Sequence, residues 1–311
     1  MLNRQKILIK IIANSGGKCT RLQLAKLSFL LSVEGRSDQL KTFYEFVPYK
    51  FGPYSFGLAH ELDGLKRDGY IIDEDENVLS LTEHGKRSSN QQLELRLLRD
   101  IELLQQHYGG LTQNSLVDTV YANHPWYTSN CIPMKNRRAT IGKAAPANFT
   151  VGYQGFQIDG LLNALLESGI KLLVDTRSNP VSRRFGYHKT RLSRLCELVG
   201  LEYRHLPELG VPSSWRQDIS TPEQYEALFE RYKREVLARQ KDLLIQTANE
   251  ISSHPSALFC REESAEHCHR KPLAAKLSAI NNLPIVNISN LKKQSTQEKE
   301  PAIRLKSILL K

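Results

Sequence analysis

No stretch of this sequence is apolar for long enough to cross a membrane. Its longest apolar runs lie at 7–13 and 27–33, and they are broken by Lys10 and by two serines, whereas a membrane span needs about 18 apolar residues or more. The first residues also lack the apolar core and the cleavage site of a secretion signal. We therefore expect a cytoplasmic protein with no membrane partner.

Cysteine is scarce as well, and its pattern argues against a disulfide framework. The five cysteines are an odd number and widely scattered, which predicts reduced thiols. No internal repeat of about 20 to 50 residues is present, which argues against solenoids and propellers. A complete dinucleotide fingerprint is also missing, because Gly152 and Gly155 have no third glycine. A nicotinamide cofactor is therefore disfavoured, and the cofactor stays unknown.

The chain does have an ordinary globular composition with an excess of positive charge. Hydrophobic residues make up 40% and charged residues 24% of its 311 residues, which suits about two folded domains. Lysine and arginine number 43 against 33 aspartates and glutamates, a net charge of +10. That balance favours a polyanionic partner, a nucleic acid or a nucleotide.

Residues 1–134 have the pattern of a mostly helical domain with one hairpin. Helices are predicted at 3–14, 20–31, 55–69, 93–107 and 113–122, and two strands with a polar turn at 70–81. Three helices followed by a hairpin are typical of a winged helix-turn-helix, a module that binds DNA or protein partners. A small, basic segment at 135–148 predicts a linker, and 291–311 predicts a basic tail.

Residues 149–290 alternate strand and helix. Strands are expected at 149–153, 171–175, 201–206, 256–260 and 284–288, with helices at 157–168, 188–199, 221–250 and 272–279 between them. Such alternation calls for crossover connections and a mainly parallel sheet. The predicted fold class is α/β: a Rossmann-like, mainly parallel sheet domain preceded by a mostly helical winged helix-turn-helix domain.

Unusual polar residues follow four of the five predicted strands. In an open parallel sheet, ligands bind beyond the carboxyl ends of the strands, so these segments are expected to meet at one edge. The candidate ligand-binding residues are Gly152, Tyr153, Gly155, Arg183, Arg184, His205, Glu208 and Cys260.

Asp175 and Arg177 leave the second of these strands two residues apart, so they can engage one ligand or form a structural ion pair. A dense basic segment at 183–194 follows, around Phe185 and Tyr187. Such a segment suits phosphates, with the two aromatic rings available for base stacking. A solvated basic helix face is the alternative for this segment.

The strongest local signal is the segment from Cys260 to Arg270, which holds two thiols, two imidazoles and three carboxylates. Pro272 at a first helical position predicts a helix N-terminus at Cys268, His269 and Arg270, where anions are favoured and the pKa of a thiol falls.

Four interpretations of this segment compete. We rank anion binding by His269 and Arg270 first. Second is a Cys260 or Cys268 thiolate nucleophile with a histidine base. A metal site made of Cys260, Cys268 and a histidine ranks third, because the paired spacing of structural zinc sites is missing, and we assign no metal ligand. A purely structural cluster is the fourth.

Four motifs of the second half resemble, in order, a bacterial family called domain of unknown function 488. They are Thr150–Gly155, Leu173–Pro180, His205–Gly210 and Cys260–Arg270, and the resemblance covers about 148–290. It implies a compact α/β domain with clustered shared residues, but no reaction. Thr176 and Ala265 stand where the family pattern has Val and Pro. Through 46–55, 62–65 and 81–85, residues 1–130 are more loosely similar to phage-associated winged-helix proteins of the YwgA type, which implies a regulatory or antitoxin-like module.

These observations favour a nucleic-acid-associated enzyme of hydrolase or nucleic-acid-processing type. It would act on a phosphate, sugar or base of DNA or a nucleotide, and a place in phage defence or mobile-element biology is one expectation. The candidate catalytic residues are Asp175, Arg177, Glu262, Cys268, His269 and Arg270. One alternative is a non-enzymatic, nucleotide-sensing regulator, and another is a redox or metal-responsive switch using Cys260 and Cys268.

Overall fold

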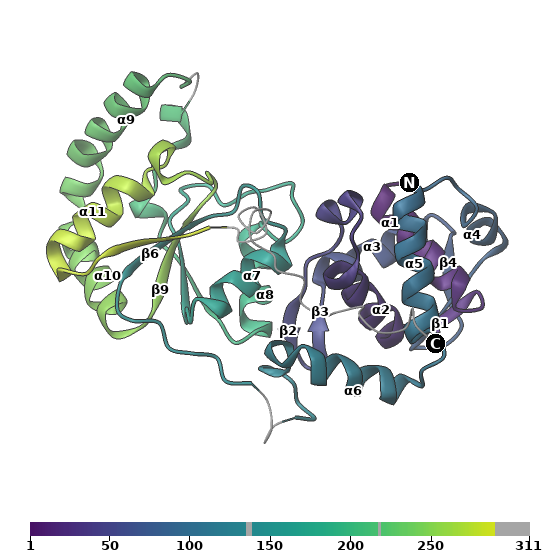
Figure 1. The fold of residues 1–311 in the computed structure, drawn as a ribbon. Coiled ribbons are helices and arrows are strands. Elements are labelled where there is room, and N and C mark those ends of the chain that lie inside the picture. The colour runs from purple at the N-terminus through teal and green to yellow at the C-terminus, as the bar shows by residue number, and fades with distance from the viewer. Residues whose placement is uncertain (135–138, 217–218, 290–311) are drawn as a thin grey trace.

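The computed structural model describes residues 1–134, 139–216 and 219–289. The chain is a mixed α/β protein with a helical N-terminal part and a C-terminal part built on a parallel sheet (Figure 1). The predicted fold class is confirmed at this level. No helix among the described residues is long and apolar enough to span a membrane.

The N-terminal part consists of short helices around a small antiparallel sheet. Its elements are α1 Asn3–Asn14, β1 Lys18–Thr20, α2 Arg21–Glu34, β2 Val47–Tyr49, β3 Gly52–Tyr54, α3 Phe56–Arg67, β4 Ile71–Asp73, β5 Val78–Leu81, α4 Glu83–Ser88, α5 Leu95–Tyr108 and α6 Gln113–Asn123. Thr20 caps α2 in the predicted capping box with Gln23. The sheet order is β1-β5-β4. Strand β1 and the β2–β3 hairpin were not expected from the sequence.

The C-terminal part alternates strands and helices, as predicted. Its elements are β6 Asn148–Gly152, α7 Ile158–Glu167, β7 Leu172–Asp175, α8 Lys189–Leu198, β8 Glu202–His205, α9 Pro222–Glu235, α10 Lys241–Ser253, β9 Ser256–Cys260, α11 Arg270–Asn281 and β10 Ile285–Ile288. The strand order is β10-β6-β9-β7-β8, and each neighbouring pair is parallel. Strand β9 therefore lies between β6 and β7, although it follows both in the chain.

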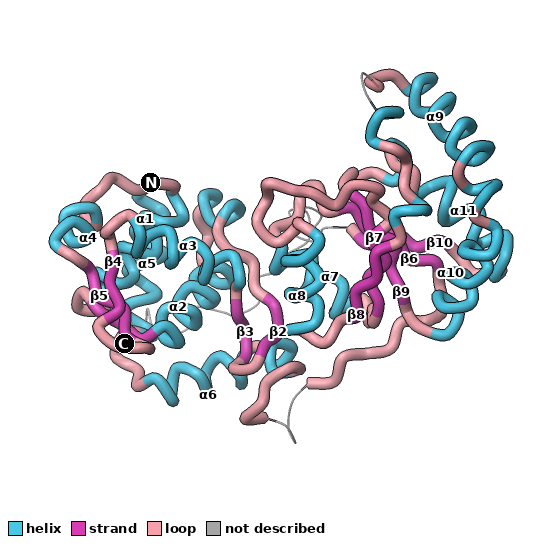
Figure 2. The backbone as a smooth tube through the Cα atoms, turned by 180° about the vertical axis from the view of Figure 1, so that it is seen from behind, coloured by secondary structure: helices cyan, strands magenta, loops and turns pink. Residues whose placement is uncertain are grey.

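Helices cover both faces of this sheet, and alternate strand residues point into two separate cores. Leu173 and Phe259 pack with α7 and α8 on one face. Val174 and Leu258 pack with α9, α10 and α11 on the other. In the reverse view of Figure 2, α7 and α8 lie between the sheet and the N-terminal part. Burial on both faces explains the apolar runs Leu172–Val174 in β7 and Ala257–Phe259 in β9.

The two parts are joined by buried contacts, among them those of α7 with β2 and α3. Asp159 of α7 accepts hydrogen bonds from the backbone N–H groups of Phe56 and Gly57, at 2.7 and 2.9 Å, and from the Ser55 hydroxyl at 3.0 Å. These donors form the N-terminus of α3, where the helix dipole favours a carboxylate. The C-terminal part thus supplies a cap for a helix of the N-terminal part.

Three predicted elements differ from the structure in their bounds. The helix expected at 221–250 is two helices, α9 and α10, separated by a 3₁₀ turn at Leu237–Arg239. Helix α11 begins at Arg270, so Pro272 is its third residue and not its first. The first strand starts at Asn148, the last residue of the predicted linker. The predicted basic tail at 291–311 lies outside the described residues.

Candidate functional site at the carboxyl edge of the sheet

The parallel sheet places the carboxyl ends of β6, β7, β8 and β9, each followed by polar residues, at the same edge. Gly152 at the end of β6 pairs with Cys260 at the end of β9, and Asp175 at the end of β7 pairs with both Phe259 and His205. The loops after β6 and β7 lead to α7 and α8, while the loop after β9 leads to α11 on the opposite face. Such a reversal point is where open sheets bind ligands.

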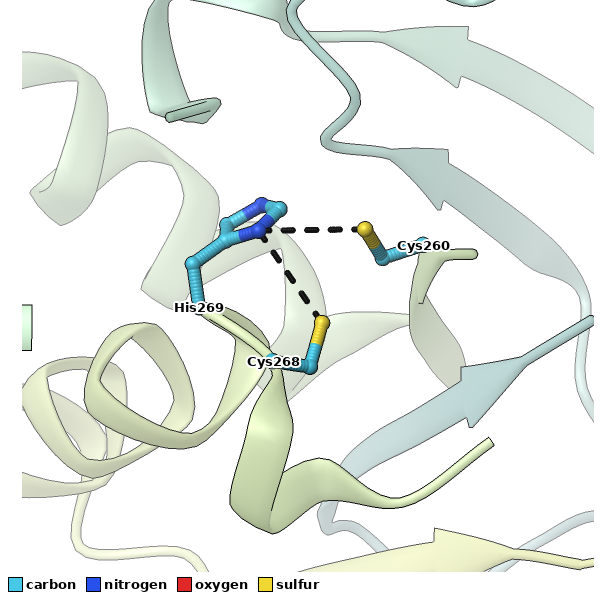
Figure 3. Close-up of side chains that lie close together, drawn as sticks. All are labelled: Cys260, Cys268 and His269. Atoms are coloured by element: carbon cyan, nitrogen blue, oxygen red, sulfur yellow. Dashed lines mark hydrogen bonds between the residues drawn. The ribbon is translucent and has the colours of Figure 1, made fainter. Parts of the chain in front are cut away.

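The centre of this edge is a buried group of two thiols and one imidazole. Cys260 ends β9, Cys268 precedes α11, and His269 is the N-cap of α11. Nδ1 of His269 lies 3.7 Å from Sγ of Cys260 and 3.9 Å from Sγ of Cys268, so that both sulfurs face the same ring nitrogen (Figure 3). All three side chains are buried. We call this group the Cys/His centre.

Hydrogen bonds fix the orientation and tautomer of His269. The hydroxyl of Thr176, just after β7, donates to the carbonyl oxygen of Phe259 at 3.0 Å, so it can only accept from the imidazole. Nε2 of His269 therefore carries the proton and donates to Thr176, with Oγ1 at 3.1 Å and the carbonyl oxygen at 3.2 Å. Nδ1 keeps its lone pair, which faces the two sulfurs and accepts from Nη2 of Arg216 at 2.6 Å.

Two arginines flank the Cys/His centre, and they differ in exposure. Arg270 is fully buried; its Nε donates to Sγ of Cys268 at 3.3 Å, and its Nη2 donates to the carbonyl oxygen of Glu262. Its Nη1 is buried with no hydrogen-bond partner among the described residues. Arg216 pairs with Glu262 at 3.0 Å, and these two side chains remain 31% and 22% exposed. The Arg216–Glu262 pair thus connects the buried centre to solvent.

The pKa values of the two thiols move in opposite directions. Burial disfavours a thiolate at Cys260, but the hydrogen bond from Cys268 and the positive charge of Arg216 lower the pKa of Cys260 well below its usual range. Burial and the neighbouring Cys260 raise the pKa of Cys268 well above its usual range. Burial and the same neighbour raise the pKa of Glu262. Perturbed groups at a sheet edge are typical of functional sites.

A comparison with protein families finds one match in this part of the chain. The model of the family described as "Domain of unknown function DUF488" matches residues 157–277, which include every residue of the Cys/His centre. The C-terminal part is thus similar to this family over the matched residues, and we call it the DUF488 domain after this match. Neither the curated proteins nor the solved structures contain a match to the chain. The N-terminal resemblance to winged-helix proteins is not confirmed by the family match.

Several predicted residues of the DUF488 domain are engaged with one another, away from the Cys/His centre. Nε and Nη2 of Arg177 donate to the two oxygens of Asp175, at 2.8 and 2.6 Å, and Nη1 donates to the Tyr187 carbonyl. Tyr203 donates to Asp175, and the His205 ring contacts the carbonyl oxygen of Arg177. Asp175 and Arg177 thus form a buried ion pair, the structural alternative that the sequence left open.

The predicted basic segment is arranged differently from a base-stacking surface. The Phe185 ring stacks on His60 of α3, with centroids 4.1 Å apart, and Arg191 lies 5.5 Å from the same ring. Tyr187 is buried and stacks on Tyr153. Both rings are therefore occupied by the protein itself. Arg183 remains exposed to solvent.

The remaining predicted residues have local roles or open positions. A Cβ atom at Gly152 would lie 1.7 Å from the carbonyl oxygen of Glu262, so this glycine lets the β9–α11 loop close over the end of β6. Gly155 has a φ of +92°, which favours glycine. Arg184 donates to the carbonyl oxygens of Tyr153 and Phe156. Glu208 is exposed in the loop after β8.

Sequence reasoning missed two residues that contact the Cys/His centre, Arg216 and Thr176. Arg216 lies in a 3₁₀ helix at Ser213–Arg216. This helix belongs to the connection between β8 and α9, which also contains Glu208. Extending the strand-end rule along that connection would have included it. Thr176 was noted only as a departure from the family pattern. Thr176 places an oxygen next to Nε2 of His269. The sequence could not predict this contact, because it depends on the pairing of β7 with β9.

Proposed function

We propose that the DUF488 domain is a hydrolase-type enzyme that cleaves a phosphate ester of a nucleotide or nucleic acid. The observation that carries the proposal is the Arg216–Glu262 pair. It is a guanidinium and a carboxylate, both partly exposed, directly beside a buried group of reactive side chains at the ligand-binding edge of a parallel sheet. The net charge of +10 supports a polyanionic substrate.

Arginine is well suited to hold the phosphate. Its planar guanidinium can donate two parallel hydrogen bonds to phosphate oxygens. Arg216 is exposed enough to meet a ligand, and the buried Nη1 of Arg270 is a donor whose hydrogen-bonding capacity is unused among the described residues. A bound phosphate would replace the Glu262 carboxylate as the partner of Arg216. Glu262 is then free to act on a proton in the reaction.

Glu262 then acts as the general base in the proposed reaction. It takes a proton from a water molecule, whose oxygen forms a bond to phosphorus while the phosphorus–oxygen ester bond breaks. The leaving oxygen takes the proton back from the Glu262 carboxyl group. Cys260, Cys268 and His269 form a buried group next to Glu262 and Arg216. Sγ of Cys260 lies 3.2 Å from Oε2 of Glu262.

Hydrolysis assays test this function with a panel of nucleotides, single-stranded and double-stranded DNA, and RNA. We expect Glu262→Gln to lower kcat by about 100-fold or more, because general bases contribute at that scale. Arg216→Met should act mainly on KM. The matched controls are Glu266→Gln and Arg234→Met, whose side chains are 66% and 70% exposed. Absence of turnover across the panel, or an unchanged rate in Glu262→Gln, contradicts the proposal.

We also propose that the N-terminal half holds the nucleic acid. Affinity for DNA that arises from phosphate contacts falls steeply as salt concentration rises. Titration of labelled duplex DNA at increasing salt should therefore show a steep loss of binding. Removing the positive charge of the exposed Arg183 should leave most of this binding intact if the N-terminal half supplies it. Salt-independent binding, or none at low salt, contradicts this part of the proposal.

One observation favours a second candidate, a ligand-responsive regulator. Helix α3 is capped by Asp159 of α7, so the two halves share a buried contact through which ligand binding could be transmitted. Thermal-shift measurements with the same nucleotide panel separate the candidates. A ligand that raises Tm without being turned over favours the regulator, and turnover that depends on Glu262 favours the enzyme.

A further inference from the structure

We propose that Cys260, Cys268 and His269 bind a zinc ion. Their ligand atoms all lie within 4.8 Å of one another. Among the described residues, no other group of three or more cysteine, histidine or carboxylate side chains is placed to hold a metal ion. The arrangement of these three residues, the chemistry of their neighbours and the position left open for a fourth ligand each support the assignment.

The distances within the Cys/His centre fit a tetrahedral ion. Zinc–sulfur bonds of about 2.3 Å and zinc–nitrogen bonds of about 2.1 Å separate a sulfur from a nitrogen by about 3.6 Å at the tetrahedral angle. The observed separations of Nδ1 of His269 from Sγ of Cys260 and Sγ of Cys268 are 3.7 and 3.9 Å. The two edges that join Nδ1 to the sulfurs are thus close to the lengths expected for one face of a zinc tetrahedron, and the three atoms point toward one another (Figure 3).

The surroundings of the three ligands match those of metal-bound residues. A histidine that binds a metal usually donates its other ring N–H to an oxygen, which aims the lone pair at the ion. Nε2 of His269 donates to Thr176 in this way, and Nδ1 faces both sulfurs. Nε of Arg270 donates to Sγ of Cys268, an interaction that stabilises a thiolate ligand. Two sulfurs and one imidazole nitrogen select zinc over magnesium or calcium.

A cationic group already faces these donor atoms. Nη2 of Arg216 lies 2.6 Å from Nδ1 of His269, and Arg216 also pairs with Glu262. A zinc ion would replace the guanidinium at Nδ1, while Arg216 keeps its pair with Glu262 beside the ion. Because Arg216 and Glu262 are the partly exposed members of the group, the fourth zinc position faces them and solvent.

An open fourth position is the mark of a catalytic zinc site, whereas structural sites have four protein ligands. The role of the ion rests on the proposed function: a water bound there would lose its proton to Glu262 and attack phosphorus as hydroxide. The water oxygen bonds to phosphorus, the ester bond breaks, and the leaving oxygen takes the proton from Glu262. Zinc changes neither oxidation state nor its three protein ligands in this step.

The test is the zinc content of the full-length protein, purified without chelators and dialysed against excess zinc and then buffer. Elemental analysis should find about one zinc per chain in the wild type. Cys260→Ser, Cys268→Ser and His269→Gln should each lower zinc content by about tenfold or more. Cys131→Ser is the matched control: Cys131 is equally buried but donates to the Tyr121 hydroxyl at 3.1 Å, and its variant should keep the full content.

Two further measurements keep the proposal falsifiable when a variant folds poorly. Cobalt added to the wild type should give the intense near-ultraviolet absorption of thiolate ligation, and Cys131→Ser should share it. Arg216→Met removes the competing cation and should retain zinc. Wild-type protein without zinc, or zinc content that persists in both Cys260→Ser and Cys268→Ser, overturns the site. Bound zinc without hydrolysis of any panel substrate overturns the proposed function alone, and hydrolysis at an unchanged rate by zinc-free protein overturns the catalytic role of the zinc alone.

Discussion

Two polar clusters lie on neighbouring strands at the carboxyl edge of the sheet, and they use their polar atoms to different extents. At the end of β7, Asp175 and Arg177 form a bidentate pair, and Tyr203, the Tyr187 carbonyl and the His205 ring occupy further positions around it. At the end of β9, a ring nitrogen of the Cys/His centre faces two sulfurs, and the flanking Arg270 is buried with an unused donor among the described residues.

The extent to which polar atoms are already hydrogen-bonded distinguishes a structural cluster from a ligand-binding one better than residue type does. Both clusters contain an acid and an arginine, and both follow a buried strand. A closed cluster gains nothing from a ligand, because each new contact must replace an existing one. At the β9 cluster one donor, Nη1 of Arg270, is unused among the described residues, so a ligand that reaches it gains a contact without breaking one. We therefore propose that the function lies at the end of β9 and that the cluster at the end of β7 stabilises the fold.

The largest expected effect comes from breaking the closed cluster. Arg177→Ala leaves the Asp175 carboxylate buried without its counter-charge, which should lower the free energy of unfolding by about 3–5 kcal/mol. Urea unfolding followed by circular dichroism measures this loss. Arg183→Ala, at an exposed position two residues before Phe185, should change stability by less than about 0.5 kcal/mol. A loss below about 1 kcal/mol for Arg177→Ala would show that the pair is not a structural element.

A smaller effect is expected at the contact between the two halves, and it depends on pH. Burial raises the pKa of Asp159 from 3.8 to about 7, although the hydrogen bonds from Gly57, Phe56 and Ser55 oppose the rise. Near neutral pH the folded protein therefore holds a proton that the unfolded chain has released. The stability from this group is present below about pH 4 and is lost as pH rises through about 7.

Between about pH 5 and pH 8, the free energy of unfolding should thus fall by about 2–3 kcal/mol through Asp159. Asp159→Asn cannot titrate, so the difference between the two pH profiles isolates this contribution from that of every other group. Urea unfolding at a series of pH values provides both profiles. Parallel profiles for wild type and Asp159→Asn would show that Asp159 stays ionised at the α3 N-terminus.

The order of elements could be predicted from sequence because local pattern determines it. Buried strands such as β7 contain continuous apolar runs, here 172–174, and the capping box at Thr20 marks the start of α2. The β2–β3 hairpin was missed because it contains prolines at 48 and 53 and only three residues per strand. The start of α11 was placed too late, because a proline fits any position of a first helical turn and Pro272 stands at its third.

The candidate site was predictable as a region but not as a set of contacts. The strand-end rule correctly placed the four loops at one edge, because it depends only on the parallel direction of the strands. It could not decide whether Arg177 binds a ligand or Asp175, since that depends on the distance between two side chains. Nor could it foresee that His60, from a different part of the chain, stacks on Phe185.

The smallest expected effect sharpens the comparison between the Cys/His centre and an ordinary buried thiol. The hydroxyl introduced by Cys260→Ser can donate to Oε2 of Glu262, which lies 3.2 Å from the present sulfur. In zinc-free protein this variant should therefore lower the free energy of unfolding by only about 1 kcal/mol. Cys196 is buried in the apolar core between α8 and the sheet, so Cys196→Ser places a hydroxyl among apolar side chains and should cost about 1–3 kcal/mol.

Urea unfolding of both variants and of the wild type, each prepared with chelator, makes this comparison directly. A larger loss at Cys196 than at Cys260 means that the centre at the end of β9 tolerates a change of chemistry that the apolar core does not. The same Cys260→Ser variant loses zinc under the proposed assignment, so its effect on ligand binding should far exceed its effect on folding. If Cys260→Ser instead unfolds the protein as strongly as Arg177→Ala, the two clusters are alike, and the centre belongs to the core.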